Sequence, residues 1–77
     1  MDFSDALRAA KEGKTVTRRF WAELDGKVAV SLELAYPVLP DGRQVAPMLV
    51  CRRSNGITGP FAGGQMDLLA DDWELAD

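Results

Sequence analysis

Apolar residues recur with two different periods along this chain, and the change of period divides it into predicted elements. Residues 2–12 carry an apolar stripe at helical spacing, which predicts an amphipathic helix. The stripe consists of Phe3, Ala6, Leu7 and Ala10. Asp2 is placed to cap the N-terminus of this helix, and Gly13 to end it. Because so short a helix is unstable in isolation, we expect its stripe to pack on a sheet.

Beyond residue 14 the apolar positions alternate with polar ones, which predicts short strands. The expected strands are residues 15–19, 27–36, 44–53, 57–61 and 72–76. The clearest signal is 27–36, which has one apolar face and one face of small and polar residues. Alternation from the first strand onward places Arg18 on one face and Arg19 and Trp21 on the other. Turns are predicted where Gly follows Asp or Asn, at residues 22–26, 41–42 and 54–56.

The C-terminal segment has a different pattern. Residues 65–71 suit a single helical turn, and a final strand follows it. The apolar side chains expected to point into the core are Met66, Leu68, Leu69, Ala70 and Trp73. The predicted fold class is α+β, in one domain spanning 1–77. In this fold an N-terminal helix packs on a small antiparallel β-sheet, with a short C-terminal helical turn and an end strand.

The size of the chain limits how stable a monomer can be. A domain of 77 residues buries only roughly 60% of its unfolded surface, and small folds usually depend on disulfides, metals or self-association. Cys51 is the only cysteine and histidine is absent, which excludes an internal disulfide and disfavours a metal site. We therefore expect a homo-oligomer. The run 48–51 is apolar on both faces of its strand, which is consistent with burial by another subunit.

Charge and hydropathy narrow the range of partners. The net charge is −3, which disfavours binding to DNA or RNA. No apolar run is long enough to cross a membrane, and the acidic N-terminus is unlike a signal peptide, so we expect a cytoplasmic location. All nine basic residues lie between Arg8 and Arg53. A pair such as Arg18–Arg19 is sufficient to bind a small phosphorylated ligand.

Side chains suited to catalysis are scarce. Without histidine, neither a Ser–His nor a Cys–His pair can form. Cys51 lies in an apolar run and is more typical of a core residue than of a reactive thiol. Asp71 and Asp72 are adjacent, which favours capping and solvation over acid–base chemistry. The composition favours a binding module over an enzyme, but it does not name a ligand.

Both ends of the sequence carry extended motifs. The first, F-x-x-A-L-x-x-x-K-x-G-K-x-V-x-R-x-x-W, is formed by Phe3, Ala6, Leu7, Lys11, Gly13, Lys14, Val16, Arg18 and Trp21. The second, D-L-L-A-x-D-W, is formed by Asp67, Leu68, Leu69, Ala70, Asp72 and Trp73. In this order and at this chain length, the sequence resembles the phage-encoded Thoeris anti-defence proteins of the second type. Phe61 stands where that family usually has a tryptophan, and Gly63-Gly64 occupies the loop that follows.

The resemblance implies a helix packed on an antiparallel sheet and a homo-oligomer, either a tetramer, as in characterised members, or a dimer. Pockets at the subunit interfaces would enclose cyclic ADP-ribose isomers made by bacterial Thoeris sensors, or cyclic oligonucleotides as in some relatives. The signal would be sequestered without catalysis or a cofactor, so that the downstream effector stays off. The expected location is then the cytoplasm of the infected bacterial host.

Each part of such a ligand has a chemical counterpart in this sequence. Adenine stacks on aromatic rings, a pyrophosphate binds guanidinium groups, and ribose hydroxyls bind amides or carboxylates. The candidate ligand-binding residues are Arg18, Arg19, Trp21, Phe61, Gln65 and Asp67.

Several charged candidates also have structural interpretations. One of Arg18 and Arg19 is expected to bind phosphate, and the other to pair with an acid such as Asp72. Asp67 suits a helix N-cap as well as it suits a ribose contact. The Arg52–Arg53 pair, beside a turn, is expected to be solvated. A rival hypothesis is a small protein-interaction module that inhibits a host protein, motivated by the two-sided apolar run and the acidic C-terminal segment.

Overall fold

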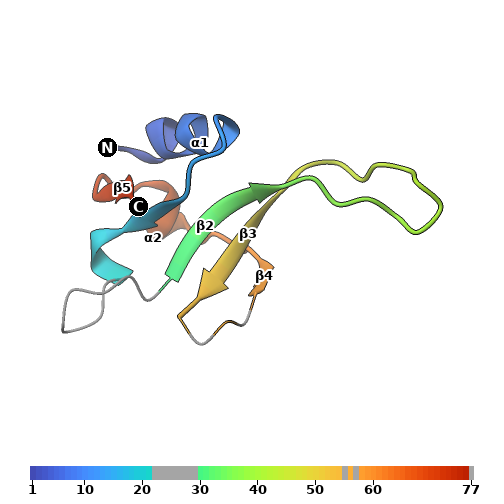
Figure 1. Cartoon of the computed structure of the whole chain (residues 1–77). Helices are drawn as coiled ribbons and strands as arrows, with labels where there is room; N and C mark the ends of the chain where they lie inside the picture. Colours follow the sequence, from blue (N-terminus) through green and yellow to red (C-terminus); the bar gives the residue numbers. More distant parts are fainter. Residues whose placement is uncertain (22–29, 55, 57, 77) are drawn as a thin grey trace.

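The computed structural model describes residues 1–21, 30–54, 56 and 58–76. Within them a helix lies against one face of an antiparallel sheet (Figure 1). In chain order the elements are α1 (Phe3–Lys11), β1 (Val16–Arg18), the 3₁₀ turn η1 (Arg19–Trp21), β2 (Val30–Ala35), β3 (Met48–Arg53), β4 (Thr58–Pro60), α2 (Gln65–Leu68) and β5 (Trp73–Leu75). The strand order is β4-β3-β2-β1-β5. The predicted α+β class, with its short C-terminal helix and end strand, is confirmed.

Helix α1 begins and ends where the sequence predicts. The Asp2 side chain accepts a hydrogen bond from the Asp5 backbone N–H at 2.9 Å, which satisfies one of the free donors of the first turn. Gly13 adopts a positive φ of 88°, and its N–H donates to the Ala10 carbonyl. A left-handed residue directly after the last turn closes a helix in this way, and glycine adopts that conformation without steric cost.

The core lies between α1 and the half of the sheet that contains β5, β1 and β2, the strands that α1 contacts most. Its buried members include Ala6, Val16, Leu32 and Trp73. Val16 pairs directly with Leu32 across β1 and β2, so both side chains project to the same face. The small side chain of Ala6 leaves room beneath the helix for the indole of Trp73. The prediction that Trp73 is a packing anchor is confirmed.

The connection between β2 and β3 leaves the sheet as a long arm, residues 36–47 (Figure 1). At its tip the Gly42 N–H donates to the Leu39 carbonyl at 2.9 Å, and Gly42 has a φ of 89°, so the predicted Asp41-Gly42 turn is confirmed. Strand β3 begins at Met48 rather than at residue 44. The preceding Pro47 has no N–H to donate to a ladder, which explains the late start.

Strand β1 is shorter than predicted, and the chain then turns instead of alternating. Arg19 to Trp21 form the 3₁₀ turn η1. The predicted placement of Trp21 on the face opposite Arg18 is therefore wrong, because the turn brings the indole back to within 5.8 Å of the Arg18 guanidinium carbon. The predicted turn at 22–26 and the first residues of the strand predicted at 27–36 lie outside the described residues, as do Asn55, Ile57 and Asp77.

The prediction that the apolar side chains of the C-terminal helical turn point into the core is also wrong for most of them. Met66 is 79% exposed and Leu69 is 76% exposed, and Leu68 is exposed as well. Asp67 takes the inward position, because its carboxylate contacts Arg18 and its carbonyl accepts a hydrogen bond from Trp73 Nε1. Ala70 does pack against the core. A helix of four residues has no second turn to reinforce an apolar stripe, so these polar contacts decide its orientation.

The packing predicts a large difference between two leucines of the sheet. Replacing the buried Leu32 with alanine should lower the free energy of unfolding by about 2–5 kcal/mol, whereas Leu75→Ala, at a side chain 48% exposed, should cost less than half as much. Guanidinium denaturation followed by circular dichroism measures both. Equal losses in the two variants would contradict the core described here.

Candidate ligand-binding site

Four aromatic rings form a cluster beside the core, contributed by segments far apart in the sequence. The Trp73 ring centroid lies 5.1 Å from that of Trp21, 5.3 Å from that of Phe3 and 6.5 Å from that of Phe61. Trp21 and Phe61 meet edge to face at 6.2 Å. Trp73 is buried, whereas Trp21 and Phe61 remain partly exposed. The cluster therefore has a structural inner member and two outer members that can contact a ligand.

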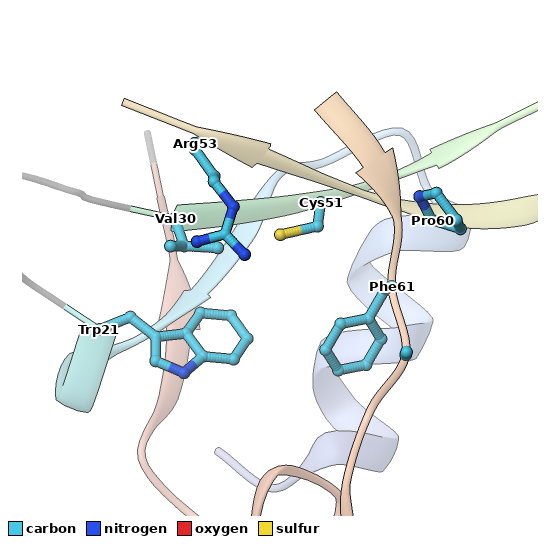
Figure 2. A pocket seen from close by; sticks show the side chains of 7 residues that line it. Trp21, Val30, Cys51, Arg53, Pro60 and Phe61 are labelled. Carbon is cyan, nitrogen blue, oxygen red and sulfur yellow. The ribbon is translucent and has the colours of Figure 1, made fainter. Parts of the chain in front are cut away.

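A cleft of about 400 Å³ opens beside these two outer rings. Its described walls are Trp21, Val30, Cys51, Arg53, Pro60, Phe61 and Ala62 (Figure 2). Strand register explains why residues of β2 and β3 contribute to it. Val30 pairs with Arg53, and Cys51 and Arg53 are two positions apart, so all three project to one face. The sheet thus supplies one wall, and the aromatic rings supply the other.

Of the six candidate residues, Trp21 and Phe61 line this cleft. Arg53, Cys51 and Val30 were not among the candidates. Alternation along β3 is a signal that places Cys51 and Arg53 together, but the pairing with Val30 depends on a register that the sequence does not specify.

The Phe61 ring owes its position to a glycine two residues later. A Cβ built at Gly63 would lie 2.5 Å from Phe61 Cε2 and 2.7 Å from Cζ, distances that real side chains do not tolerate. The ring therefore rests on bare backbone. A Cβ at Gly64 would meet nothing within 4 Å, so the two neighbouring glycines have different roles.

Arg18 lies at the base of the aromatic cluster and holds three segments together. Its Nη1 contacts Asp67 Oδ1 at 2.6 Å, and its Nε contacts Asp72 Oδ1 at 2.8 Å. The side chain is only 11% exposed. These ion pairs join β1 to α2 and to the turn before β5, and we name them the Arg18 clamp. The expected pairing of one of the two arginines with Asp72 is confirmed for Arg18.

Asp72 has a second function within the Arg18 clamp. Its Oδ2 accepts a hydrogen bond from the Phe20 N–H at 3.0 Å, which fixes the start of η1 and hence the position of Trp21. The hydrogen bond with Arg18 is the main cause that lowers the pKa of the Asp72 carboxyl, and the same bond raises the pKa of Arg18. The carboxylate form of Asp72 is therefore the one that the folded chain stabilises.

The remaining candidates lie apart from the lining of the cleft. The Arg19 side chain is 79% exposed, with its Nε 3.7 Å from Glu74 Oε2. Gln65 is exposed on α2. Gly64 rather than Asp67 is the N-cap of α2, so the capping interpretation of Asp67 is wrong. As a ligand-binding residue, Asp67 remains a prediction, together with Arg18, Arg19 and Gln65.

The fold and the cleft define a small α+β protein with an aromatic-lined cleft at the edge of its core. The chain belongs to the Tad2-like family, whose sequence profile, described as the Thoeris anti-defense 2-like domain, matches residues 1–76. Membership of this family supports a role against the Thoeris defence. No curated protein matches the chain. Among the described residues, no helix is long and apolar enough to cross a membrane.

The position of Phe61 can be tested with the two glycines. Gly63→Ala should force the ring off the backbone, cost about 1–3 kcal/mol of stability and shift the tryptophan emission spectrum, because Phe61 contacts both indoles. Gly64→Ala, which adds the same methyl group in open space, is the matched control and should leave the spectrum unchanged. Identical spectra for the two variants would contradict the proposed contact.

The Arg18 clamp predicts a pH dependence of stability. Because the pKa of Asp72 is lowered by folding, its contribution is complete above the ordinary aspartate pKa of about 4 and is lost as the pH falls through the lowered value. Asp72→Asn should melt several degrees below the natural protein at pH 7, and the gap should close below about pH 4. Asp71→Asn, at the adjacent exposed position, should melt like the natural protein at pH 7. A gap for Asp72→Asn that stays constant down to pH 3 would be inconsistent with this clamp.

Proposed function

We propose that this protein sequesters a cyclic nucleotide immune signal and releases it unchanged when the protein unfolds. The expected ligands are cyclic ADP-ribose isomers, with cyclic oligonucleotides as a second class, and the expected site of action is the cytoplasm of the infected bacterium. The observation that carries the proposal is the cleft walled by Trp21 and Phe61 in a chain of an anti-defence family.

The chemistry of the cleft suits a nucleobase. Aromatic side chains that are partly exposed offer π-faces, and stacking of a base on such a face contributes about 1–3 kcal/mol. Cys51, Pro60 and Ala62 add apolar surface around the rings. Among the described lining residues there is no carboxylate to act as a general base, which favours binding over hydrolysis.

Self-association is part of the proposal. A cleft of about 400 Å³ lies toward the lower end of the 300–1,000 Å³ that ligand pockets span, so a second chain would complete the enclosure. The arm offers a surface for that chain. Its exposed apolar side chains, together with the first residue of β3, are Tyr36, Val38, Leu39, Val45 and Met48. We propose that a second copy covers them, in a dimer or a tetramer.

A second candidate function is inhibition of a host protein by direct contact. It is favoured by the apolar side chains around α2, because Met66 and Leu69 are largely exposed. Leu69 also borders a second cleft, which lies between α1 and the segment after α2 and includes Phe3 and Leu7. A surface of this kind is typical of a protein interface.

The single cysteine allows the ligand position to be tested directly. Cys51 is the only thiol in the chain and lines the cleft, so a saturating cyclic ADP-ribose isomer should slow its alkylation by iodoacetamide at least about tenfold, as expected for a site blocked by bound ligand. Mass spectrometry measures the modified fraction over time. Ribose at the same concentration, which has no base to stack on Trp21 and Phe61, controls for nonspecific protection.

Heating the complex then distinguishes a sponge from an enzyme. The ligand should be recovered chemically intact from the denatured protein. Recovery of a cleaved product would support an enzyme instead. If neither cyclic ADP-ribose isomers nor cyclic dinucleotides protect Cys51, while a stoichiometric host protein binds and Met66→Asp prevents its binding, the second function replaces the first.

A further inference from the structure

Two arginines lie close to the aromatic cluster, and they differ in how their charge is used. Arg18 contacts two carboxylates, those of Asp67 and Asp72, at 2.6 and 2.8 Å. The Arg18 clamp therefore carries more negative than positive charge. A phosphate brought to this place would meet two carboxylates at once, and it could bind the guanidinium only by displacing one of them. Arg18 is consequently poorly suited to hold an anion.

Arg53, unlike Arg18, is not paired with a described carboxylate. It is the last residue of β3, and its side chain lines the cleft. Figure 2 shows the guanidinium directed past Val30 toward the side of the cleft where Trp21 lies. Within the described part of the chain, no carboxylate forms an ion pair with it. An unpaired guanidinium beside an aromatic cleft retains all of its hydrogen-bond donors for a ligand.

The neighbouring Arg52 shows that this arrangement is specific to one position. Successive residues of a strand project to opposite faces, so Arg52 lies on the other face of the sheet. There it pairs with Glu33 at 2.5 Å, and Ser31 is its register partner on β2. Two adjacent arginines of the same strand thus have separate functions. Arg52 is held by an ion pair, and Arg53 forms no ion pair with the carboxylates that the structure describes.

We propose that Arg53 binds the phosphate group of a ligand whose base stacks on Trp21 and Phe61. This inference rests on the proposed function and specifies the ligand chemistry of its site, which is an aromatic base joined to a phosphate or pyrophosphate. The base occupies the apolar part of the cleft, and the anion lies at the rim beside β3. Arg18 then acts as a positioning residue, because its guanidinium carbon lies 5.8 Å from the Trp21 ring centroid, within reach of a cation–π contact with the indole.

The test compares four proteins by calorimetry with a cyclic ADP-ribose isomer as the probe. Arg53→Gln should weaken binding roughly 10- to 100-fold, the range expected for loss of a charge-assisted hydrogen bond. Arg53→Lys, which keeps the charge without the planar fork, should retain part of the affinity. Arg52→Gln is the matched control and should bind within about threefold of the natural protein.

Two further readouts separate a ligand contact from a general effect of charge or folding. Arg53→Gln should keep the melting temperature of the natural protein, because its guanidinium has no ion-pair partner among the described residues. Its residual binding should also depend less on salt concentration. Unchanged affinity in Arg53→Gln, or an equal loss in Arg52→Gln, would overturn the assignment.

Inorganic pyrophosphate distinguishes failure of this inference from failure of the proposed function. In nuclear magnetic resonance spectra of the natural protein, pyrophosphate should shift the Arg53 Nε–H resonance and leave that of Arg18 in place. If no cyclic nucleotide binds but this shift is seen, sequestration of those signals is wrong while the anion site stands. If the Arg18 resonance shifts instead, or neither shifts, the assignment of Arg53 is wrong.

Discussion

The contact of Arg18 with two aspartates is the interaction on which the rest of this small structure depends. Among the described residues, the fully buried apolar core is two alanines, Val16, Leu32 and Trp73, which is a small apolar area for a chain of this length. Short strands at the edge of the sheet gain little from their own ladders. The Arg18 clamp compensates, because its guanidinium joins β1 to α2 and to the turn before β5. The Asp72 carboxylate in turn accepts the hydrogen bond that fixes the start of η1. The aromatic cluster assembles around that arrangement.

This use of Arg18 has a consequence for the chemistry of the cleft. Because Arg18 is paired with the carboxylates of Asp67 and Asp72, it contributes little positive potential at a bound ligand. Arg18, whose guanidinium carbon lies 5.8 Å from the Trp21 ring centroid, is thus held by structural contacts, whereas Arg53 lines the cleft and forms no ion pair with any described carboxylate. In the proposed site, folding and ligand recognition would therefore use different arginines. A net charge of −3 is compatible with the proposed anion site, because local potential depends on where the charges lie.

The parts of the fold that depend on local sequence were predictable, and the parts that depend on distant partners were not. The capped helix α1, the turn at Gly42 and the end strand β5 each carry a local signal. The outward side of α2 does not, because Asp67 faces inward only through its contact with Arg18, far away in the sequence. Trp21 and Phe61 were identified as candidates. Arg53 was expected to be solvated and is exposed, but its position in the lining of the cleft was not predicted. Its place in the cleft follows from its pairing with Val30, a register that no short motif encodes.

Prolines restrict the backbone of the arm. Three of the four prolines in the chain, Pro37, Pro40 and Pro47, lie within it. Because proline restricts the backbone of the free arm, the arm would lose less conformational entropy on binding the proposed second chain. Proline also lacks the N–H that edge-to-edge strand pairing requires. The prolines thus stiffen the arm and disfavour strand pairing along its edges.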